Sequence, residues 1–203
     1  MIRTGLTFAA LPAVAGALLG WQGWWVPAIA LLAVAGFILF FFRDPERAVP
    51  TTPGAIVAPA DGRVLTVEEV TLDDGAYTQV SIFLSLFDVH VNRAPIGGTI
   101  ARVRYRPGKF HVASGQHASR ENEQNEVVLE GDGLRVVFRQ IAGILARRIE
   151  FWKKPGDAVV RGQRLGMIRF GSRAEVVFDR RCRLQVKPGE HVRAGSTILA
   201  IRE

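Results

Sequence analysis

Cysteine is almost absent from the sequence, because Cys182 is the only one among 203 residues. A single cysteine forms no internal disulfide and cannot by itself build a thiolate metal site. The H-E-x-x-H spacing of zinc proteases is also missing, so no metal site is predicted. Arginines at positions 180, 181 and 183 would lower the pKa of a reactive thiol. The interpretation we favour is an unreactive strand cysteine in a reducing compartment.

Signatures of nucleic-acid binding are missing as well, although the chain is basic. Lys and Arg number 26 against 19 Asp and Glu, which gives a formal net charge of +7. No RRM, KH or zinc-finger spacing accompanies this charge. A basic excess still attracts an anionic partner. We therefore expect an anionic membrane as the partner, and no nucleic acid.

Charged residues are absent from two apolar runs near the N-terminus, which cover residues 5–20 and 26–42. Three tryptophans lie between them in the sequence WQGWW, and tryptophan prefers the headgroup level of a bilayer. Each run is slightly shorter than the roughly 20 residues of a spanning helix. The pattern predicts a hydrophobic helical hairpin that spans the bilayer, nearly spans it, or forms a re-entrant segment.

Basic residues flank this hairpin, with Arg3 before it and Arg43 and Arg47 after it. The positive-inside tendency would put both ends in the cytoplasm, so we expect the cytoplasmic face of the cell membrane. A cleaved signal peptide is the alternative, but a second apolar run does not suit it. The polar, proline-rich exit predicts a membrane-associating part at 1–47 and a second domain at 48–203.

The rest of the chain shows strand patterns and repeats itself. Residues 154–169 read KPGDAVVRGQRLGMIR, and residues 187–202, 33 positions later, read KPGEHVRAGSTILAIR. Such a dense match indicates a repeated turn–strand–turn–strand unit. It resembles the half-motif of lipoyl and biotinyl carriers, so the predicted fold is mainly β, a barrel-sandwich (lipoyl-like) domain with minor helix. Residues 170–186 contain no lysine, which counts against a carrier. A short helix over 140–151 is also expected.

The pair Gly171-Ser172 lies between two predicted strands, where a small pair is ordinarily a turn. A serine hydrolase would need a histidine base and an orienting acid. The G-x-S-x-G elbow of many hydrolases is missing, because Arg173 and Ala174 follow the serine. His90 ends an apolar strand, and Asp88 would share its strand face. Asp61 precedes Gly62, and Asp-Gly is a common turn pair.

Six segments follow one another along the chain: FFRDPER, APADGRV, LSLFDVHVNRAPIGG, NEQNEVVLE, IAGILARRIEFW and RFGSRAEVVF. Taken in order, they resemble the phosphatidylserine decarboxylase family in its short, membrane-associated form. The resemblance covers essentially the whole chain, and no single element decides it.

The resemblance implies an enzyme that cuts its own backbone between Gly171 and Ser172. The products would be a β chain (1–171) and an α chain (172–203), which stay together as a heterodimer. Ser172 would become a pyruvoyl group, the only cofactor, whose ketone serves as an electron sink. The implied reaction converts phosphatidylserine to phosphatidylethanolamine and CO2.

The family assigns roles in cleavage and decarboxylation to an Asp and a His that match Asp61 and His90. Two positions depart from the family pattern. Arg93 replaces a second histidine, and Arg173 follows the serine in place of threonine. Each arginine is a candidate contact for the substrate or for developing negative charge. The competing hypothesis is a membrane-anchored, non-enzymatic barrel-sandwich adaptor.

Overall fold

The computed structural model describes residues 2–72, 75–115, 117–131, 133–144, 148–169 and 171–202. The chain divides into two compact units, Met1–Glu46 and Arg47–Glu203. Each unit has its own internal packing, and the two are described separately.

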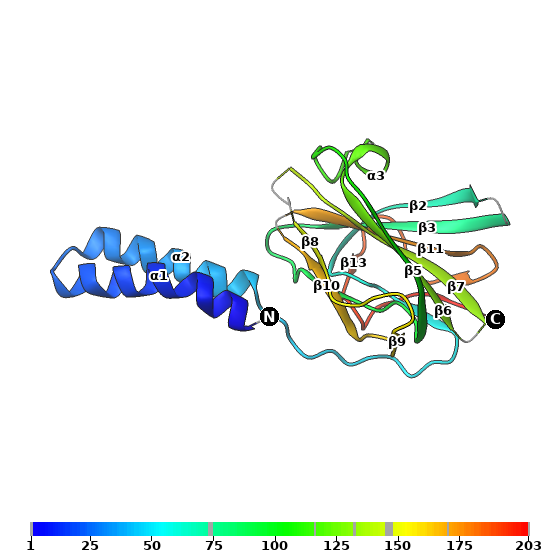
Figure 1. Cartoon of the computed structure of the whole chain (residues 1–203), viewed down its shortest axis with the longest axis horizontal. Coiled ribbons are helices and arrows are strands. Elements are labelled where there is room, and N and C mark those ends of the chain that lie inside the picture. The colour runs from blue at the N-terminus through cyan, green and yellow to red at the C-terminus, as the bar shows by residue number, and fades with distance from the viewer. Residues whose placement is uncertain are drawn as a thin grey trace. The chain divides into compact units, whose positions relative to one another are not determined.

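The first unit is a pair of helices, α1 (Ile2–Trp21) and α2 (Trp25–Phe41), joined by a tight turn (Figure 1). Small residues line their contact: a Cβ added to Gly16 would lie 3.1 Å from the carbonyl oxygen of Ala28. Such close approach of backbones is typical of helices that pack within a bilayer. The outward side chains are apolar too, and Trp21, Trp24 and Trp25 are exposed at the turn.

By length and composition alone, α1 is suited to cross a membrane over Thr4–Trp21, whereas α2 is a shorter apolar helix. The sequence expectation that both runs fall short is therefore corrected for α1, which extends beyond the uncharged run at each end. The predicted apolar helical pair is confirmed.

The second unit consists of antiparallel sheets, so the predicted mainly β fold is confirmed. An eight-stranded sheet has the order β13–β2–β3–β11–β7–β6–β5–β9. In that order the strands are His191–Val192, Gly62–Leu72, Gly75–Leu84, Ser172–Asp179, Leu134–Ile141, Gln124–Gly131, Gly98–Arg106 and Ala158–Val159. In Figure 1 this sheet curls around the core of the unit.

Two three-stranded sheets complete the unit, and one short helix, α3 (Ala118–Glu121), lies in the loop before β6. One sheet has the order β1 (Ala55–Val57), β14 (Ile198–Ile201), β12 (Arg183–Leu184). The other has the order β4 (Val91–Arg93), β10 (Arg164–Ile168), β8 (Ile149–Phe151). The helix expected over 140–151 is wrong at both ends, because residue 141 ends β7 and β8 begins at residue 149. Residues 145–147 lie outside the described residues.

The predicted repeat is present as two copies of one backbone unit. Gly156 and Gly189 have φ of +91° and +93°, and Gly162 and Gly195 have φ of +77° and +74°. These left-handed conformations favour glycine. Matching glycines in matching turns show that the sequence repeat is also a structural repeat.

An earlier segment completes each copy with the same hydrogen bonds. The Gly195 N–H donates to the carbonyl of Ala58, and the Gly162 N–H donates to the carbonyl of Ala94, both at 2.8 Å. We call residues 58–64 with 187–202 the Asp61 copy, and residues 94–100 with 154–169 the Gly97 copy. Their first segments read APADGRV and APIGGTI, so Asp61 and Gly97 hold the same place.

Candidate active site

Ser172 is the first residue of β11, one of the two central strands of the large sheet. It pairs with Leu84 of β3, and its neighbour Arg173 pairs with Ile141 of β7. Side chains alternate along a strand, and the next residues on the Ser172 side, Ala174 and Val176, belong to the hydrophobic core. The serine is fully buried.

The buried Ser172 Oγ has no hydrogen-bond partner among the residues that the structure describes. Leaving a buried hydroxyl unpaired costs about 1–3 kcal/mol. A buried hydroxyl that lowers the stability of the fold in this way is a candidate nucleophile, because a nucleophile must keep a lone pair available.

Gly171 presents its carbonyl to a close-fitting surface. Its φ of +61° lies in the left-handed region. A Cβ added to Gly143, just after β7, would lie 2.1 Å from the Gly171 carbonyl oxygen and 3.2 Å from the Cβ of Ala113. Only a glycine at position 143 therefore permits this carbonyl to pack where it does.

His90 is fully buried and lies beside β10, the strand that precedes Gly171-Ser172 in the chain. β4, which follows His90, pairs with β10, and the Ile168 N–H approaches the His90 carbonyl oxygen at 3.4 Å. The Nδ1 atom lies 2.9 Å from the carbonyl oxygen of Asp88. A carbonyl only accepts, so Nδ1 carries a proton, and in the neutral ring Nε2 holds the basic lone pair.

The expectation that Asp88 shares a strand face with His90 is wrong. β3 ends at Leu84, and Asp88 lies in the turn that follows. Its carboxylate accepts hydrogen bonds from the N–H and Oγ of Ser85, at 2.8 and 2.7 Å, and contacts Nε2 of His191 at 3.0 Å. Aspartate forms such local turns readily. Asp88 touches His90 through its backbone, not through its carboxylate.

Asp61 is nearly buried at the start of β2, and both of its oxygens are engaged. Oδ1 accepts the Ala194 N–H at 2.8 Å, and Oδ2 pairs with Nη2 of Arg47 at 2.7 Å. The sequence did not identify Arg47 as its partner, because the two lie on opposite sides of a proline-rich stretch. At the equivalent place Gly97 has no side chain, yet the backbone is the same.

The two candidate arginines are both buried and lie on different elements. Nη1 of Arg93 donates to the carbonyl of Gly162 at 3.2 Å. Arg173 points to the sheet face opposite Ser172, where Nη2 donates to Oγ of Ser81 at 2.7 Å and Nε pairs with Glu175 at 2.9 Å. These contacts anchor the scaffold, and a contact of either arginine with substrate stays a prediction.

Sequence reasoning missed the loop that covers the start of β11. Asn122 is fully buried, and its amide donates to the carbonyls of His111 and Ala142 at 2.9 and 2.8 Å. Oγ of Ser119 donates to Glu175 at 2.6 Å. These bonds hold the segment around Ser119 and Asn122 against the end of β7 and against β11. The polar run NEQN before an apolar strand was the available signal.

A chain of buried amides lies beside His90. Asn125 donates to the side-chain oxygen of Gln140 at 3.0 Å, and Gln140 donates to the side-chain oxygen of Asn92 at 2.9 Å. Gln140 pairs with Ala174 in the sheet, and Asn92 lies two residues after His90. The network links β4, which follows His90, to β7, the strand that pairs with the strand of Ser172.

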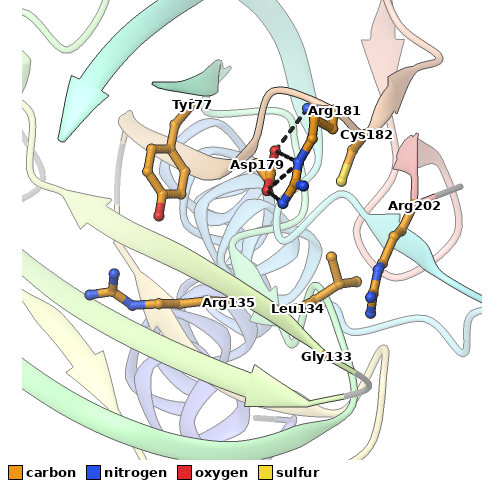
Figure 2. A pocket seen from close by; sticks show the side chains of 8 residues that line it. All are labelled: Tyr77, Gly133, Leu134, Arg135, Asp179, Arg181, Cys182 and Arg202. Carbon is orange, nitrogen blue, oxygen red and sulfur yellow. Dashed lines mark hydrogen bonds and ion pairs between the residues drawn. The ribbon is translucent and has the colours of Figure 1, made fainter. Parts of the chain in front are cut away.

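A cavity of about 310 Å³ lies at the opposite end of β11 (Figure 2). Its lining residues are Tyr77, Gly133, Leu134, Arg135, Asp179, Arg181, Cys182 and Arg202. The Arg181 guanidinium lowers the pKa of Asp179 to about 2. Burial raises the pKa of the Cys182 thiol, so the flanking arginines do not activate it. This cavity is remote from Ser172 along the strand.

Comparison with known proteins gives a consistent result. The family model for phosphatidylserine decarboxylase matches residues 34–200. A phosphatidylserine decarboxylase proenzyme of Solibacter usitatus is 49% identical over 202 residues, which is 100% of this chain and 97% of the relative. Proteins of the same name from Desulfotalea psychrophila and Ralstonia pickettii are 45% and 49% identical over 84% and 81% of this chain, and over 81% and 78% of their own lengths. The chain belongs to the phosphatidylserine decarboxylase family.

Proposed function

We propose that this chain is a self-processing decarboxylase that converts phosphatidylserine to phosphatidylethanolamine and CO2, using a pyruvoyl group made from Ser172. The observation that carries the proposal is the buried, unpartnered Ser172 Oγ directly after Gly171, whose carbonyl is seated on Gly143.

The proposed cut begins with attack of the Ser172 Oγ on the Gly171 carbonyl carbon. A base removes the hydroxyl proton, and the nitrogen of residue 172 gains a proton as the peptide becomes an ester. β-Elimination then releases a carboxylate at Gly171 and leaves dehydroalanine at 172. Hydrolysis of the enamine yields a ketone and releases ammonia. No external oxidant or reductant is required.

The surrounding residues fit these steps. Gly143 fixes the carbonyl so that its position is set before attack, which lowers the entropic cost of reaction. His90, with Nδ1 bound to the Asp88 carbonyl, is the proposed base through Nε2. Asp61 is the second proposed participant, and Arg47 together with the Ala194 N–H fixes its carboxylate.

After the cut, the pyruvoyl ketone would supply the electron sink for loss of CO2. The chain's own contribution is to hold the new N-terminus and exclude water. β11 is paired along its length with β3 and over five residues with β7, so the 172–203 chain stays bound to the 1–171 chain. The apolar helical pair would hold this heterodimer on the cytoplasmic face of an anionic membrane.

The decisive experiment replaces Ser172 with alanine and measures intact mass and CO2 release. Wild type should yield fragments 1–171 and 172–203, the second without a free amine. Ser172→Ala should give one uncut chain and no CO2. Ser196→Ala is the matched control, because Gly195-Ser196 is also a Gly-Ser pair whose glycine has a left-handed conformation. Cleavage in the Ser172 variant, or an active uncut wild type, would refute the proposal.

A further inference from the structure

Three exposed apolar side chains lie on segments whose neighbouring residues contact the Gly171–Ser172 region. Phe87, Val112 and Ile144 are 69%, 52% and 49% exposed, and we call them the rim. Large apolar side chains that gather on one part of a surface mark a site of interaction.

Each rim residue is tied to the Gly171–Ser172 region by a contact of a near neighbour in sequence. Phe87 follows β3, whose last residue Leu84 pairs with Ser172. Ile144 follows Gly143, on which the Gly171 carbonyl packs. Val112 precedes Ala113, whose Cβ would lie 3.2 Å from a Cβ on Gly143. Three separate segments therefore bring apolar groups to one end of the sheet.

We propose that the rim inserts into the surface of an anionic bilayer and brings the Ser172 end of the sheet to the headgroups. This inference rests on the proposed function, because only a lipid substrate requires the site to face a bilayer. Exposed basic side chains lie near the rim in sequence: Arg120, Lys109, which also pairs with Glu121, and Arg148, which also pairs with Glu150. Apolar side chains flanked by cations are the pattern of interfacial binding to anionic lipid.

The chain also keeps the second unit close to a bilayer. Residues 42–54 join the apolar helical pair to β1, and this stretch reaches at most about 45 Å when extended. A tethered domain samples the membrane surface at high effective concentration, so three partly inserted side chains suffice to orient it. A lipid substrate explains why exposed apolar groups lie on the segments next to the buried Ser172.

The direct experiment places an environment-sensitive fluorophore on the rim. The full-length chain carrying Ile144→Cys is labelled with NBD and reconstituted into phosphatidylserine-containing vesicles. We expect a blue-shifted emission that lipid-borne quenchers reduce. Val160→Cys is the matched control, because Val160 is 69% exposed and follows β9, whose partner is the beginning of β5, away from Ser172. The buried Cys182 should stay unlabelled in wild type.

A second experiment separates docking from chemistry. The triple variant Phe87→Ser, Val112→Ser, Ile144→Ser should cut itself fully and keep its rate on a short-chain, monomeric phosphatidylserine. On vesicles its kcat/KM should fall by about 10-fold or more, because the buried apolar area is lost. Val160→Ser should match wild type on both substrates.

The outcomes distinguish the two proposals. If position 144 remains as solvent-exposed as position 160 in vesicles while the enzyme is active, the rim proposal fails and the proposed function stands. If the protein releases no CO2 from either substrate, the proposed function fails, and the fluorescence result still decides whether the rim meets the bilayer. A misfolded triple variant would show as uncut chain, and the labelled single variants then carry the test.

Discussion

The two central strands of the large sheet, β11 and β7, begin after a glycine of similar backbone conformation, but their first side chains differ in chemistry. β11 begins at Ser172 after Gly171, with φ of +61°, and β7 begins at Leu134 after Gly133, with φ of +67°. The strands are antiparallel, so their beginnings lie at opposite ends of the sheet. At one end the side chain is a buried serine, and at the other a leucine lines the cavity of Figure 2.

The two repeat copies differ in the same informative manner. Asp61 in one copy stands where the other has Gly97, and His90, before β4, stands where Gly54 precedes β1. Glycine satisfies the backbone at both of these places. The scaffold therefore does not require a carboxylate at 61 or an imidazole at 90. A left-handed glycine followed by the first residue of a strand is therefore an ordinary turn by itself, as at Gly133. The added polar side chains of Asp61 and His90 distinguish the equivalent place at Gly171 as a candidate reaction site.

The largest effect is expected from Gly143→Ala, which places a side chain where the Gly171 carbonyl packs. The new Cβ would lie 2.1 Å from that carbonyl oxygen, far inside van der Waals contact. The carbonyl or the end of β7 must move, so self-cleavage should be undetectable on a denaturing gel. Gly156→Ala is the control: it adds backbone strain at φ of +91° but meets no atom within 4 Å.

Gly156→Ala should lower stability by about 1–2 kcal/mol, the cost of a left-handed conformation for an L residue, and leave cleavage unchanged. Normal cleavage in a folded Gly143→Ala protein would show that the reaction does not require the Gly171 carbonyl to pack at this position. The Gly171 carbonyl would then be no more constrained than the carbonyl of an ordinary turn.

Local sequence signals predicted much of this molecule. The repeat was visible because its glycines and prolines recur at fixed spacing, and the apolar runs near the N-terminus marked the helical pair. The position of Gly171-Ser172 between two predicted strands was visible locally, but its role in cleavage came only from the resemblance to a family. The same dipeptide at Gly195-Ser196 is an ordinary turn, so the pair alone does not identify the site.

Contacts between distant segments were beyond prediction. Gly143, Asn122 and Arg47 act through partners 11 to 28 residues away, such as the Asp61 carboxylate. Nothing in the local pattern names those partners. Asp88 was misplaced because alternation continues past Leu84, where β3 has already ended in a turn. The apolar run over 140–151 suited a helix, but pairing with β11 and β10 made its ends strands.

The second largest effect is expected from Asp61→Gly, which gives the Asp61 copy the residue of the Gly97 copy. The backbone should be retained, because Gly97 supports the same turn. Loss of an acid–base group typically slows a reaction by about 10²–10⁴-fold, so cleavage should slow to that extent. Time courses on a gel measure the rate, and a thermal melt tests the fold.

Asp61→Asn refines this prediction. The amide still accepts the Ala194 N–H but carries no charge for Arg47. We expect a melting temperature closer to wild type than that of Asp61→Gly, with cleavage slowed just as strongly. Wild-type cleavage in either variant would show that Asp61 serves only to hold Arg47 and the repeat turn.

The smallest effect on self-cleavage is expected from Leu134→Ser, which creates a second Gly-Ser pair at the beginning of β7. The backbone at Gly133 is left-handed like that at Gly171, but Gly54 and Gly97 stand where the first site has His90 and Asp61. Without an acid or base in place, the new hydroxyl has no means to lose its proton. Stability should fall by about 2–5 kcal/mol, as for truncation of a buried leucine. Intact mass should show the cut after Gly171 and none after Gly133, whereas a second cut would mean that backbone conformation alone drives the reaction.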